Sequence, residues 1–325
     1  MSLLQRVSNL VNRTRDLNRR PFDPGTSVAP SSGRWPIVHY GVMIPGLPEP
    51  FRFFDAIVVL GTSRAPIFDN HKLVRTTPED SAWVLIGTAL TRDSFQALSI
   101  ADDCTLAPDG NTLRFGSDLS IVRSADRIVL KASRPEADIE LVIRATSAVS
   151  HFVNIPAVYS HWSVLGQYEG HFTPRGGETI SQRGLCTYEY ARAMNVPLPL
   201  RFFTYQILNI DDHTQVLMTE VLAVGGLPAS RFVYVRRTDG TATVHSTGFR
   251  HEVLTSTTAT TPDGHTMRLP ETFRWSCGDL ITIEGETNRD FAYGLAAGYA
   301  GSYRYHGTFE GRAIDGVGYI EWIER

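Results

Sequence analysis

The amino-acid sequence predicts an all-β fold of antiparallel strands, arranged as sandwiches or barrels. From residue 34 onward, short segments rich in β-branched and aromatic residues recur along the chain. Turn-forming sequences with Asp-Gly separate several of these segments, as at 108–111, 238–240 and 262–264. Long helical patterns of apolar residues are nearly absent from this part. Many short strands with frequent turns are typical of antiparallel sandwiches and barrels.

The strands that we assign individually are short and mostly apolar. They are Phe53–Leu60, Ala82–Ile86, Leu119–Val122, Arg127–Ala132, Ile139–Ala145, Leu185–Arg192 and Phe202–Ile210. Residues 292–300 are rich in small side chains, but this segment is too short and too often interrupted by glycine to be predicted as a helix.

The first twenty residues differ from the rest of the chain. Their apolar residues are spaced for one face of a helix, namely Leu3, Leu4, Val7, Leu10, Val11 and Leu17. Five arginines against one aspartate make this segment basic. Such a helix could contact an acidic membrane surface, but packing on the folded protein is the interpretation that we favour. A linker rich in proline and serine follows, so residues 1–33 form a segment of their own.

Composition restricts the class of protein. The chain has 325 residues, a formal net charge of −3 and 42% hydrophobic residues, which is typical of globular proteins. This charge argues against a nucleic-acid partner. No apolar run is long enough to cross a bilayer, and the N-terminus lacks the apolar core of a secretory signal. Three widely spaced cysteines without a CxxC pair favour a reduced, cytoplasmic protein.

A short pattern occurs twice, in which an aromatic-Glu-Gly sequence precedes a strand that carries a glycine and, five residues later, a glutamate. The two copies are Tyr168–Gly170 with Gly184 and Glu189, and Phe309–Gly311 with Gly316 and Glu321. If each copy closes a domain, the first domain spans residues 34–192 and the second spans residues 193–325.

The strand Leu185–Arg192 carries the main candidate for chemistry, Glu189. Alternation along this strand places Leu185, Thr187, Glu189 and Ala191 on one face, and Cys186, Tyr188, Tyr190 and Arg192 on the other. A carboxyl group on the first, weakly polar face would be desolvated, so its pKa would rise and it could hold or deliver a proton. The alternative is a structural ion pair with an arginine across the sheet, which the matching Glu321 supports. Both interpretations stay open.

Other candidates lie close by in the sequence. His161 and His171 flank the first aromatic-Glu-Gly pattern, and each could be an acid or base near neutral pH or a strand histidine with a satisfied hydrogen bond. Gln206 interrupts the apolar face that Phe202 begins, where it could orient a ligand or satisfy the backbone. No GxSxG, Walker or HExxH signature is present, and the ten histidines show no spacing of a metal site.

Six short segments match, in order, the pattern of a known family. They are Gly184–Tyr190, Phe202–Ile207, Asp211-Asp212, Leu217-Met218, Arg274-Trp275 and Gly316–Glu321. The chain thereby resembles AttH-like proteins, which are similar to hydroxyneurosporene synthase (carotenoid 1,2-hydratase), over residues 34–325. The resemblance implies two tandem lipocalin-like antiparallel β-barrel domains with few helices. It also implies a pocket for a hydrophobic small molecule (a terpenoid, lipid or polyketide-like compound) at or near their interface.

The resemblance further implies hydration, isomerisation or cyclisation by acid/base chemistry, without a metal or organic cofactor. The catalytic candidates are Glu189, His161 and Tyr190, and the ligand-binding candidates are Trp162, His171, Thr187, Tyr188, Arg192, Phe202 and Gln206. Where the family has Asp-His, this chain has Glu189-Tyr190, so the acid is kept and the imidazole is lost. The alternative function is therefore a non-catalytic carrier, with residues 1–20 aiding contact with membranes. The sequence does not indicate an oligomeric state.

Overall fold

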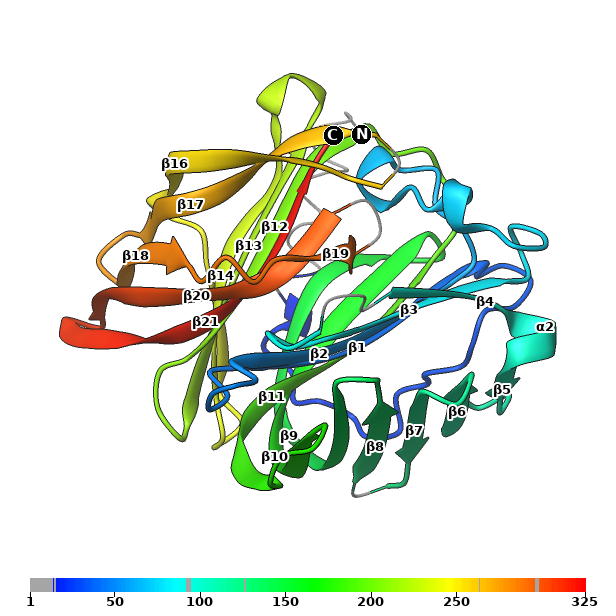
Figure 1. Cartoon of the computed structure of the whole chain (residues 1–325). Coiled ribbons are helices and arrows are strands. Elements are labelled where there is room, and N and C mark those ends of the chain that lie inside the picture. Colours follow the sequence, from blue (N-terminus) through cyan, green and yellow to red (C-terminus); the bar gives the residue numbers. More distant parts are fainter. Residues whose placement is uncertain (1–13, 15, 92–94, 126, 263, 296–297) are drawn as a thin grey trace.

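Two antiparallel β-sheets make up most of the protein (Figure 1). The computed structural model describes residue 14 and residues 16–325, except 92–94, 126, 263 and 296–297. The described helices are short: α2 (Ile100–Asp103), and the single turns η1 (Pro66–Phe68), η2 (His71–Leu73) and η3 (Val224–Gly226). The prediction of an all-β fold with few helices is confirmed, and the strand Phe53–Leu60 has its predicted bounds.

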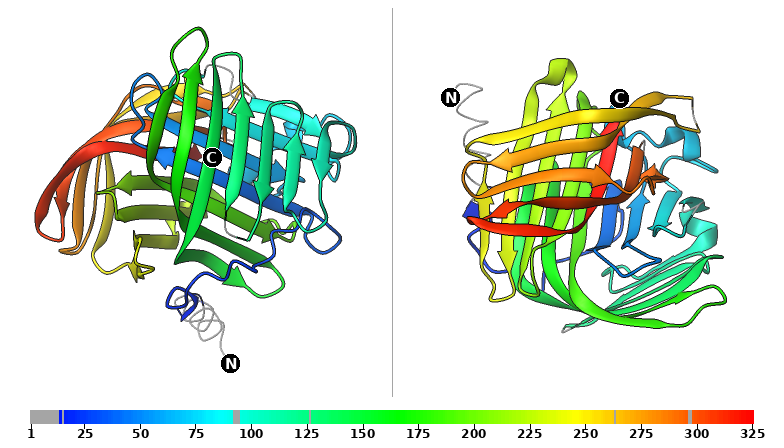
Figure 2. Two further views of the ribbon diagram at one scale, coloured as in Figure 1. Left: turned by 90° about the horizontal axis from the view of Figure 1, so that it is seen from below. Right: turned by 60° about the vertical axis from the view of Figure 1, so that its left-hand side comes forward.

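The first sheet, which we call barrel 1, has eleven strands in the order β4-β3-β2-β1-β11-β10-β9-β8-β7-β6-β5. Their bounds are β1 Ile37–Pro45, β2 Phe53–Leu60, β3 Ser81–Gly87, β4 Phe95–Ser99, β5 Cys104–Leu106, β6 Thr112–Phe115, β7 Leu119–Arg123, β8 Ile128–Ser133, β9 Ala137–Ile155, β10 Tyr159–Pro174 and β11 Ile180–Ala193. The first strand pairs with the last, and α2 joins the edge strands β4 and β5. The sheet therefore curls back on itself with one gap, between β4 and β5, and in the left view of Figure 2 the strands β7–β9 lie in front of β1 and β2.

The second sheet, barrel 2, repeats this plan with the order β15-β14-β13-β12-β21-β20-β18-β17-β16, and β19 pairs with β20 beside it. The bounds are β12 Leu200–Asn209, β13 Thr214–Ala223, β14 Pro228–Arg237, β15 Ala242–His245, β16 Phe249–Thr260, β17 Thr266–Cys277, β18 Ile281–Thr287, β19 Ala292–Leu295, β20 Gly298–Phe309 and β21 Arg312–Glu324. Again the first strand pairs with the last, and the edge strands β15 and β16 are neighbours in the chain.

Each barrel has its own apolar interior, and a third apolar cluster lies between them. We call this contact between the outer faces of the two barrels the seam. Barrel 1 contributes Met43, Phe53, Ile57, Trp83 and Leu85, and barrel 2 contributes Tyr205, Ile207, Leu217, Tyr234, Tyr319 and Ile323. Strands of both barrels thus have one face in a barrel interior and one in the seam, which is why they are apolar on both faces.

The two copies of the aromatic-Glu-Gly pattern occupy different places in corresponding hairpins. Glu169 and Gly170 lie inside strand β10, whereas Glu310 and Gly311 are the turn between β20 and β21. The strands that follow are equivalent, because β11 and β21 each close their sheet by pairing with its first strand. The repeat therefore marks two closing strands, with hairpin turns of unequal length.

The predicted N-terminal helix falls mostly on residues 1–13 and 15, which lie outside the described part of the chain. Of the segment that follows, Asn18 contacts the backbone of His151 in β9 through two hydrogen bonds of 2.7 and 3.1 Å. Residues 292–295 and 298–300 belong to strands β19 and β20, in keeping with the expectation that this segment is no helix. Among the described residues, no helix combines the length and apolarity needed to cross a membrane.

Candidate functional site

Three neighbouring strands of barrel 1 bring two histidines to either side of Glu189. In the pairing of β11 with β1 and β10, Glu189 lies opposite Gly41 and Ser163, while His39 and His161 both lie opposite Ala191. The two imidazoles are therefore diagonal neighbours of the carboxylate on one face of the sheet. The small side chains at the positions opposite Glu189 leave room for this arrangement.

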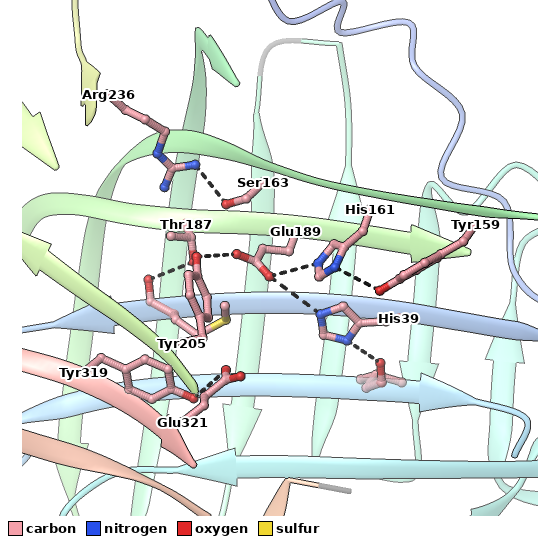
Figure 3. Close-up of polar contacts among 12 residues, drawn as sticks. His39, Tyr159, His161, Ser163, Thr187, Glu189, Tyr205, Arg236, Tyr319 and Glu321 are labelled. Carbon is pink, nitrogen blue, oxygen red and sulfur yellow. Dashed lines mark hydrogen bonds and ion pairs between the residues drawn. The ribbon is translucent and has the colours of Figure 1, made fainter. Parts of the chain in front are cut away.

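The polar atoms converge on the carboxylate in the seam (Figure 3). Nε2 of His161 lies 3.4 Å from Oε2 of Glu189, and Nε2 of His39 lies 3.8 Å from the same oxygen. On the other side, the hydroxyl of Tyr205 from barrel 2 donates to Oε1 at 2.6 Å. We call His39, His161, Glu189 and Tyr205 the Glu189 centre. Both barrels contribute to it, so the centre is complete only when they are packed together.

The outer nitrogens of the two imidazoles are also engaged. Nδ1 of His39 is 3.2 Å from the carbonyl oxygen of Val58, and Nδ1 of His161 is 3.3 Å from the hydroxyl of Tyr159. A carbonyl only accepts hydrogen bonds, so Nδ1 of His39 carries a proton and its Nε2 presents a lone pair when the ring is neutral. The donor atoms of His39, His161 and Glu189 all lie within 4.8 Å of one another, so these three residues could hold a metal ion.

Electrostatics keep Glu189 ionised despite its burial. Desolvation raises the pKa of Glu189, but His161 and His39, when their Nε2 atoms carry protons, outweigh this effect through hydrogen bonds and charge and hold the pKa below its usual range. Burial lowers the pKa of the His161 imidazole, and the carboxylate only partly offsets this effect. At neutral pH the centre is therefore a carboxylate beside a neutral His161. The expectation that the pKa of Glu189 is raised by desolvation is wrong, because imidazoles from two other strands accompany the carboxylate.

A second group of carboxyls lies beside the Glu189 centre. The hydroxyl of Tyr319 lies 3.2 Å from Oδ2 of Asp55 and 3.1 Å from Oε1 of Glu321. One hydroxyl proton cannot satisfy two carboxylates, so one carboxyl must be protonated for the contact to be favourable throughout. Burial raises the pKa of Asp55 to about 7, and burial together with the charge of Glu189 raises the pKa of Glu321.

The wild type is expected to become less stable as the pH rises because of Asp55, and replacing Asp55 by asparagine should abolish this dependence. The folded-state pKa of about 7 exceeds the unfolded value of 3.8, so the contribution of Asp55 is fully present below pH 3.8 and is lost as the pH rises through 7. A shift of this size corresponds to at most about 4 kcal/mol. Thermal unfolding of both proteins at pH 4.5 and pH 8 measures the difference.

In that experiment Asp55→Asn should gain stability relative to the wild type as the pH increases. Exposed Asp212→Asn serves as the control for removal of a surface carboxylate. Equal differences between Asp55→Asn and wild type at both pH values would show that Asp55 is ionised in the folded protein across this range.

A buried arginine connects the barrels next to the Glu189 centre. Arg236 of β14 donates from Nη1 to Oγ of Ser163 at 2.8 Å, and from Nη2 to Oε1 of Gln215. Gln215 donates to Asn209 at 2.7 Å, which donates to the carbonyl of Leu185 in barrel 1 at 2.9 Å. This chain of hydrogen bonds starts and ends in barrel 1 and passes through barrel 2, so it fixes the seam on one side of Glu189.

Of the residues singled out in the sequence, Glu189, His161 and Thr187 come together in the seam. Thr187 is buried beside Glu189 along β11 and lies within 3.5 Å of the carbonyl of Met43. The predicted alternation along this strand is confirmed, because Tyr188 and Tyr190 point the other way. No arginine forms an ion pair with Glu189 among the described residues, so the structural alternative for this residue does not hold there.

Most of the other candidate residues on strands β10 and β11 point into the interior of barrel 1. The ring of Trp162 packs against Tyr188 at 6.0 Å and against Tyr190 at 5.8 Å, and the hydroxyl of Tyr190 donates to the carbonyl of Ala29 at 2.8 Å. Arg192 lies over the ring of Trp35 at 4.7 Å. These side chains do not reach Glu189, because successive residues of a strand point to opposite faces.

The remaining candidates lie in barrel 2 or on the surface. Gln206 is buried inside barrel 2, where its Oε1 accepts from the indole of Trp275 at 2.9 Å. Phe202 packs edge-on against Trp322 in the same interior, with a ring distance of 4.8 Å. His171 is exposed and lies 3.1 Å from the hydroxyl of Ser181. None of the three joins the Glu189 centre.

The centre contains two residues that sequence reasoning missed, His39 and Tyr205. His39 precedes the first individually assigned strand, and nothing in its neighbourhood sets it apart from other histidines. Tyr205 lies next to Gln206, on the opposite face of the same strand. Alternation alone could have grouped Tyr205 with Phe203 and Ile207 as a second face, but only the seam gives that face a function.

Two surface depressions lie away from the Glu189 centre. One of about 670 Å³ runs over the outer face of barrel 1 and is lined by Glu169, His171 and Arg183, among others. A second of about 380 Å³ lies near Arg231 and Phe249, at the gap of barrel 2. Both are open to solvent, whereas the Glu189 centre brings buried polar groups into direct contact, so we take it as the candidate site on its geometry.

Comparison with solved structures finds the same fold in two proteins. A protein assigned as AttH from Nitrosomonas europaea has a TM-score of 0.62 at 12% identity, over 94% of this chain and 99% of that one. Kievitone hydratase from Nectria haematococca has a TM-score of 0.57 at 11% identity, over 94% of this chain and 98% of that one. These likenesses confirm the resemblance to AttH-like proteins at the level of fold.

The sequence matches no curated protein. A family of unknown function, DUF6670, matches residues 57–325, which include every strand from β3 onward. Because the match covers most of the chain, the protein belongs to the DUF6670 family.

Proposed function

We propose that this protein binds a hydrophobic small molecule at the seam between its barrels and adds water to it, or removes water from it, at the Glu189 centre. The observation that carries the proposal is the convergence of two imidazole nitrogens on one oxygen of a buried carboxylate, whose other oxygen is held by Tyr205. Such a cluster is costly to bury, and it contains the residue types that perform acid/base chemistry.

Aromatic rings beside the centre suit a hydrophobic ligand. Phe152 of β9 lies 4.8 Å from the ring of His161, 5.6 Å from Tyr205 and 5.2 Å from Tyr234. These rings form an apolar wall next to the polar atoms, as small-molecule sites commonly do. The side chains of His39 and His161 are each 18% exposed, whereas that of Glu189 is 3% exposed. A ligand could therefore approach from the histidine side.

The chemistry requires a held water molecule and a proton returned to the substrate. In hydration, the oxygen of water forms a bond to one carbon of a C=C group, and a proton is added to the other carbon. The centre accepts one proton from the attacking water and supplies one proton to the product, so it ends as it began. Oε2 of Glu189 and the two facing nitrogens offer the lone pairs that hold and orient this water.

Fold similarity suggests the reaction class without establishing it. Kievitone hydratase shares the fold over nearly the whole chain, and its name describes a hydration. One fold can host many functions, so the argument for this protein rests on the Glu189 centre.

The three cysteines, Cys104, Cys186 and Cys277, are free thiols, which supports a reducing compartment such as the cytoplasm.

An isotope experiment tests the proposed function. The purified protein is incubated in water enriched in oxygen-18 with a panel of hydrophobic alkenes, including terpenoids and prenylated phenols. We expect mass spectrometry to detect a product that has gained one heavy water molecule, with no such product from heat-denatured protein. Extraction of the fresh protein with organic solvent should also reveal which compound class co-purifies with it.

Two results would count against the proposal. A compound that binds in stoichiometric amount but is recovered unchanged would identify the protein as a carrier. A panel in which nothing binds and nothing changes, although kievitone is included, would remove the support for a hydrophobic ligand.

A further inference from the structure

Three atoms that can each ligate a cation face one point in the Glu189 centre, because Nε2 of His39, Nε2 of His161 and Oε2 of Glu189 all lie within 4.8 Å of one another. Nδ1 of His39 carries the ring proton because it faces the carbonyl of Val58, so the neutral ring turns the lone pair of Nε2 toward Oε2 of Glu189. A lone pair facing a carboxylate oxygen at 3.8 Å is repulsive unless a cation or a second proton lies between the two atoms. The same oxygen also faces Nε2 of His161 at 3.4 Å.

The side chains of His39, His161 and Glu189 are oriented by outer hydrogen bonds, as those of metal ligands usually are. Each has its second polar atom fixed: His39 by the carbonyl of Val58 at 3.2 Å, His161 by the hydroxyl of Tyr159 at 3.3 Å, and Glu189 by the hydroxyl of Tyr205 at 2.6 Å. Such outer hydrogen bonds set the tautomer of ligating histidines and orient ligating carboxylates. The Tyr159 hydroxyl can accept from Nδ1 of His161, which leaves Nε2 of His161 free for an ion.

We propose that His39, His161 and Glu189 bind a divalent transition-metal ion of the zinc class in the seam. Two imidazoles and one carboxylate suit zinc and related ions, whereas calcium and magnesium prefer oxygen ligands throughout. Bonds of about 2.0–2.1 Å in tetrahedral geometry place ligand atoms roughly 3.3 Å apart. The observed separations of 3.4 and 3.8 Å from Glu189 therefore need only small side-chain movements.

The chemistry of the site changes with the ion. Three protein ligands leave a fourth position, which is the arrangement of catalytic rather than structural zinc sites. A water molecule in that position would be acidified by the ion, and the ring of Phe152 packs 4.8 Å from the ring of His161, one of the three ligands. The inference deepens the proposed function by naming what holds the water, but metal binding can be measured without any substrate.

Metal analysis of the purified full-length chain tests the inference. The protein is prepared without a histidine tag, stripped with a chelator, dialysed against micromolar zinc and analysed by inductively coupled plasma mass spectrometry. We expect one zinc per chain in the wild type, and at least hundredfold weaker binding in His39→Gln and in His161→Gln. Cobalt(II) in place of zinc should give visible absorption bands in the wild type that both variants lose.

A matched control comes from barrel 2. Nδ1 of His251 lies 2.6 Å from Oε2 of Glu220, which makes a buried carboxylate–imidazole pair without a second histidine in the described structure. His251→Gln should therefore keep its zinc. The apo wild type provides a readout that needs no variant, because one equivalent of zinc should raise its Tm and the same concentration of magnesium should not.

The inference is overturned if the wild type retains less than a tenth of an equivalent of zinc, or if the two variants at 39 and 161 bind as tightly as His251→Gln. Turnover that persists in chelated protein would show that the ion does not hold the reacting water, and would leave the proposed function intact. Zinc at one equivalent in a protein that changes no substrate would support the inference and end the proposed function.

Discussion

Replacing Arg236 by alanine is expected to destabilise the protein by about 3 kcal/mol or more. The guanidinium of Arg236 is completely buried and contacts Ser163 of barrel 1 and Gln215 of barrel 2. Alanine removes these hydrogen bonds, leaves the partner groups unsatisfied and creates a cavity in the seam. It also removes a buried positive charge that interacts with Glu189.

Chemical unfolding followed by both far-ultraviolet circular dichroism and tryptophan fluorescence measures this effect. Arg237→Ala is the matched control, because the neighbouring arginine is partly exposed and forms an ion pair with Glu310 near the surface at 2.6 Å. Surface ion pairs contribute about 1 kcal/mol or less. If Arg236→Ala proved as mild as Arg237→Ala, the hydrogen-bond chain across the seam would contribute little to stability.

Replacing Glu189 by glutamine is expected to lower turnover at least hundredfold on the substrate that the isotope experiment identifies. Glutamine has nearly the same shape and can still accept from Tyr205, but it cannot take up a proton and is a far weaker ligand for a cation. A hundredfold loss corresponds to about 2.7 kcal/mol of lost transition-state stabilisation. Steady-state kinetics with both proteins give the ratio of kcat/KM.

The control for this loss is Glu220→Gln, which alters a buried carboxylate beside a histidine away from the seam. Glu220→Gln should retain most of the activity, and the unfolding midpoint of each variant shows how much of its loss reflects folding. Full activity in Glu189→Gln would exclude this carboxylate from the chemistry.

Tyr205→Phe keeps the ring and removes the donor to Oε1, so a smaller loss of activity is expected for it.

The β-architecture follows from patterns that act over a few residues. The segment Phe53–Leu60 is a strand because β-branched and aromatic side chains favour extended backbone, and its turns are encoded beside it. Alternation along Leu185–Arg192 separates Glu189 from Tyr188 and Tyr190 in the sequence as it does in the structure. These properties need no knowledge of distant residues, so one sequence is enough to predict them.

The candidate site depends on residues that are far apart in the chain. His39 and His161 flank Glu189 only because β1 and β10 pair with β11 in one register, and a shift by one residue would turn each histidine to the other face. Their spacing of 122 and 28 residues contains no metal-binding or catalytic motif, so sequence inspection alone predicted neither His39 nor a metal. The ligand-binding candidates that lie inside the barrels, away from Glu189, could not be recognised as such for the same reason, because their position depends on how distant strands pair.

The pattern of residues along the chain was enough to predict the all-β class, several strands, and the face of β11 that carries Glu189. What that face contacts depends on how distant parts of the chain pack together. Local propensity and alternation specify how each strand is extended and which side chains share a face, whereas the partner of a face is set by the packing of two sheets. The weakly polar surroundings expected for Glu189 are replaced by two imidazoles, which strand pairing in barrel 1 places beside it, and by Tyr205, which the packing of barrel 2 adds.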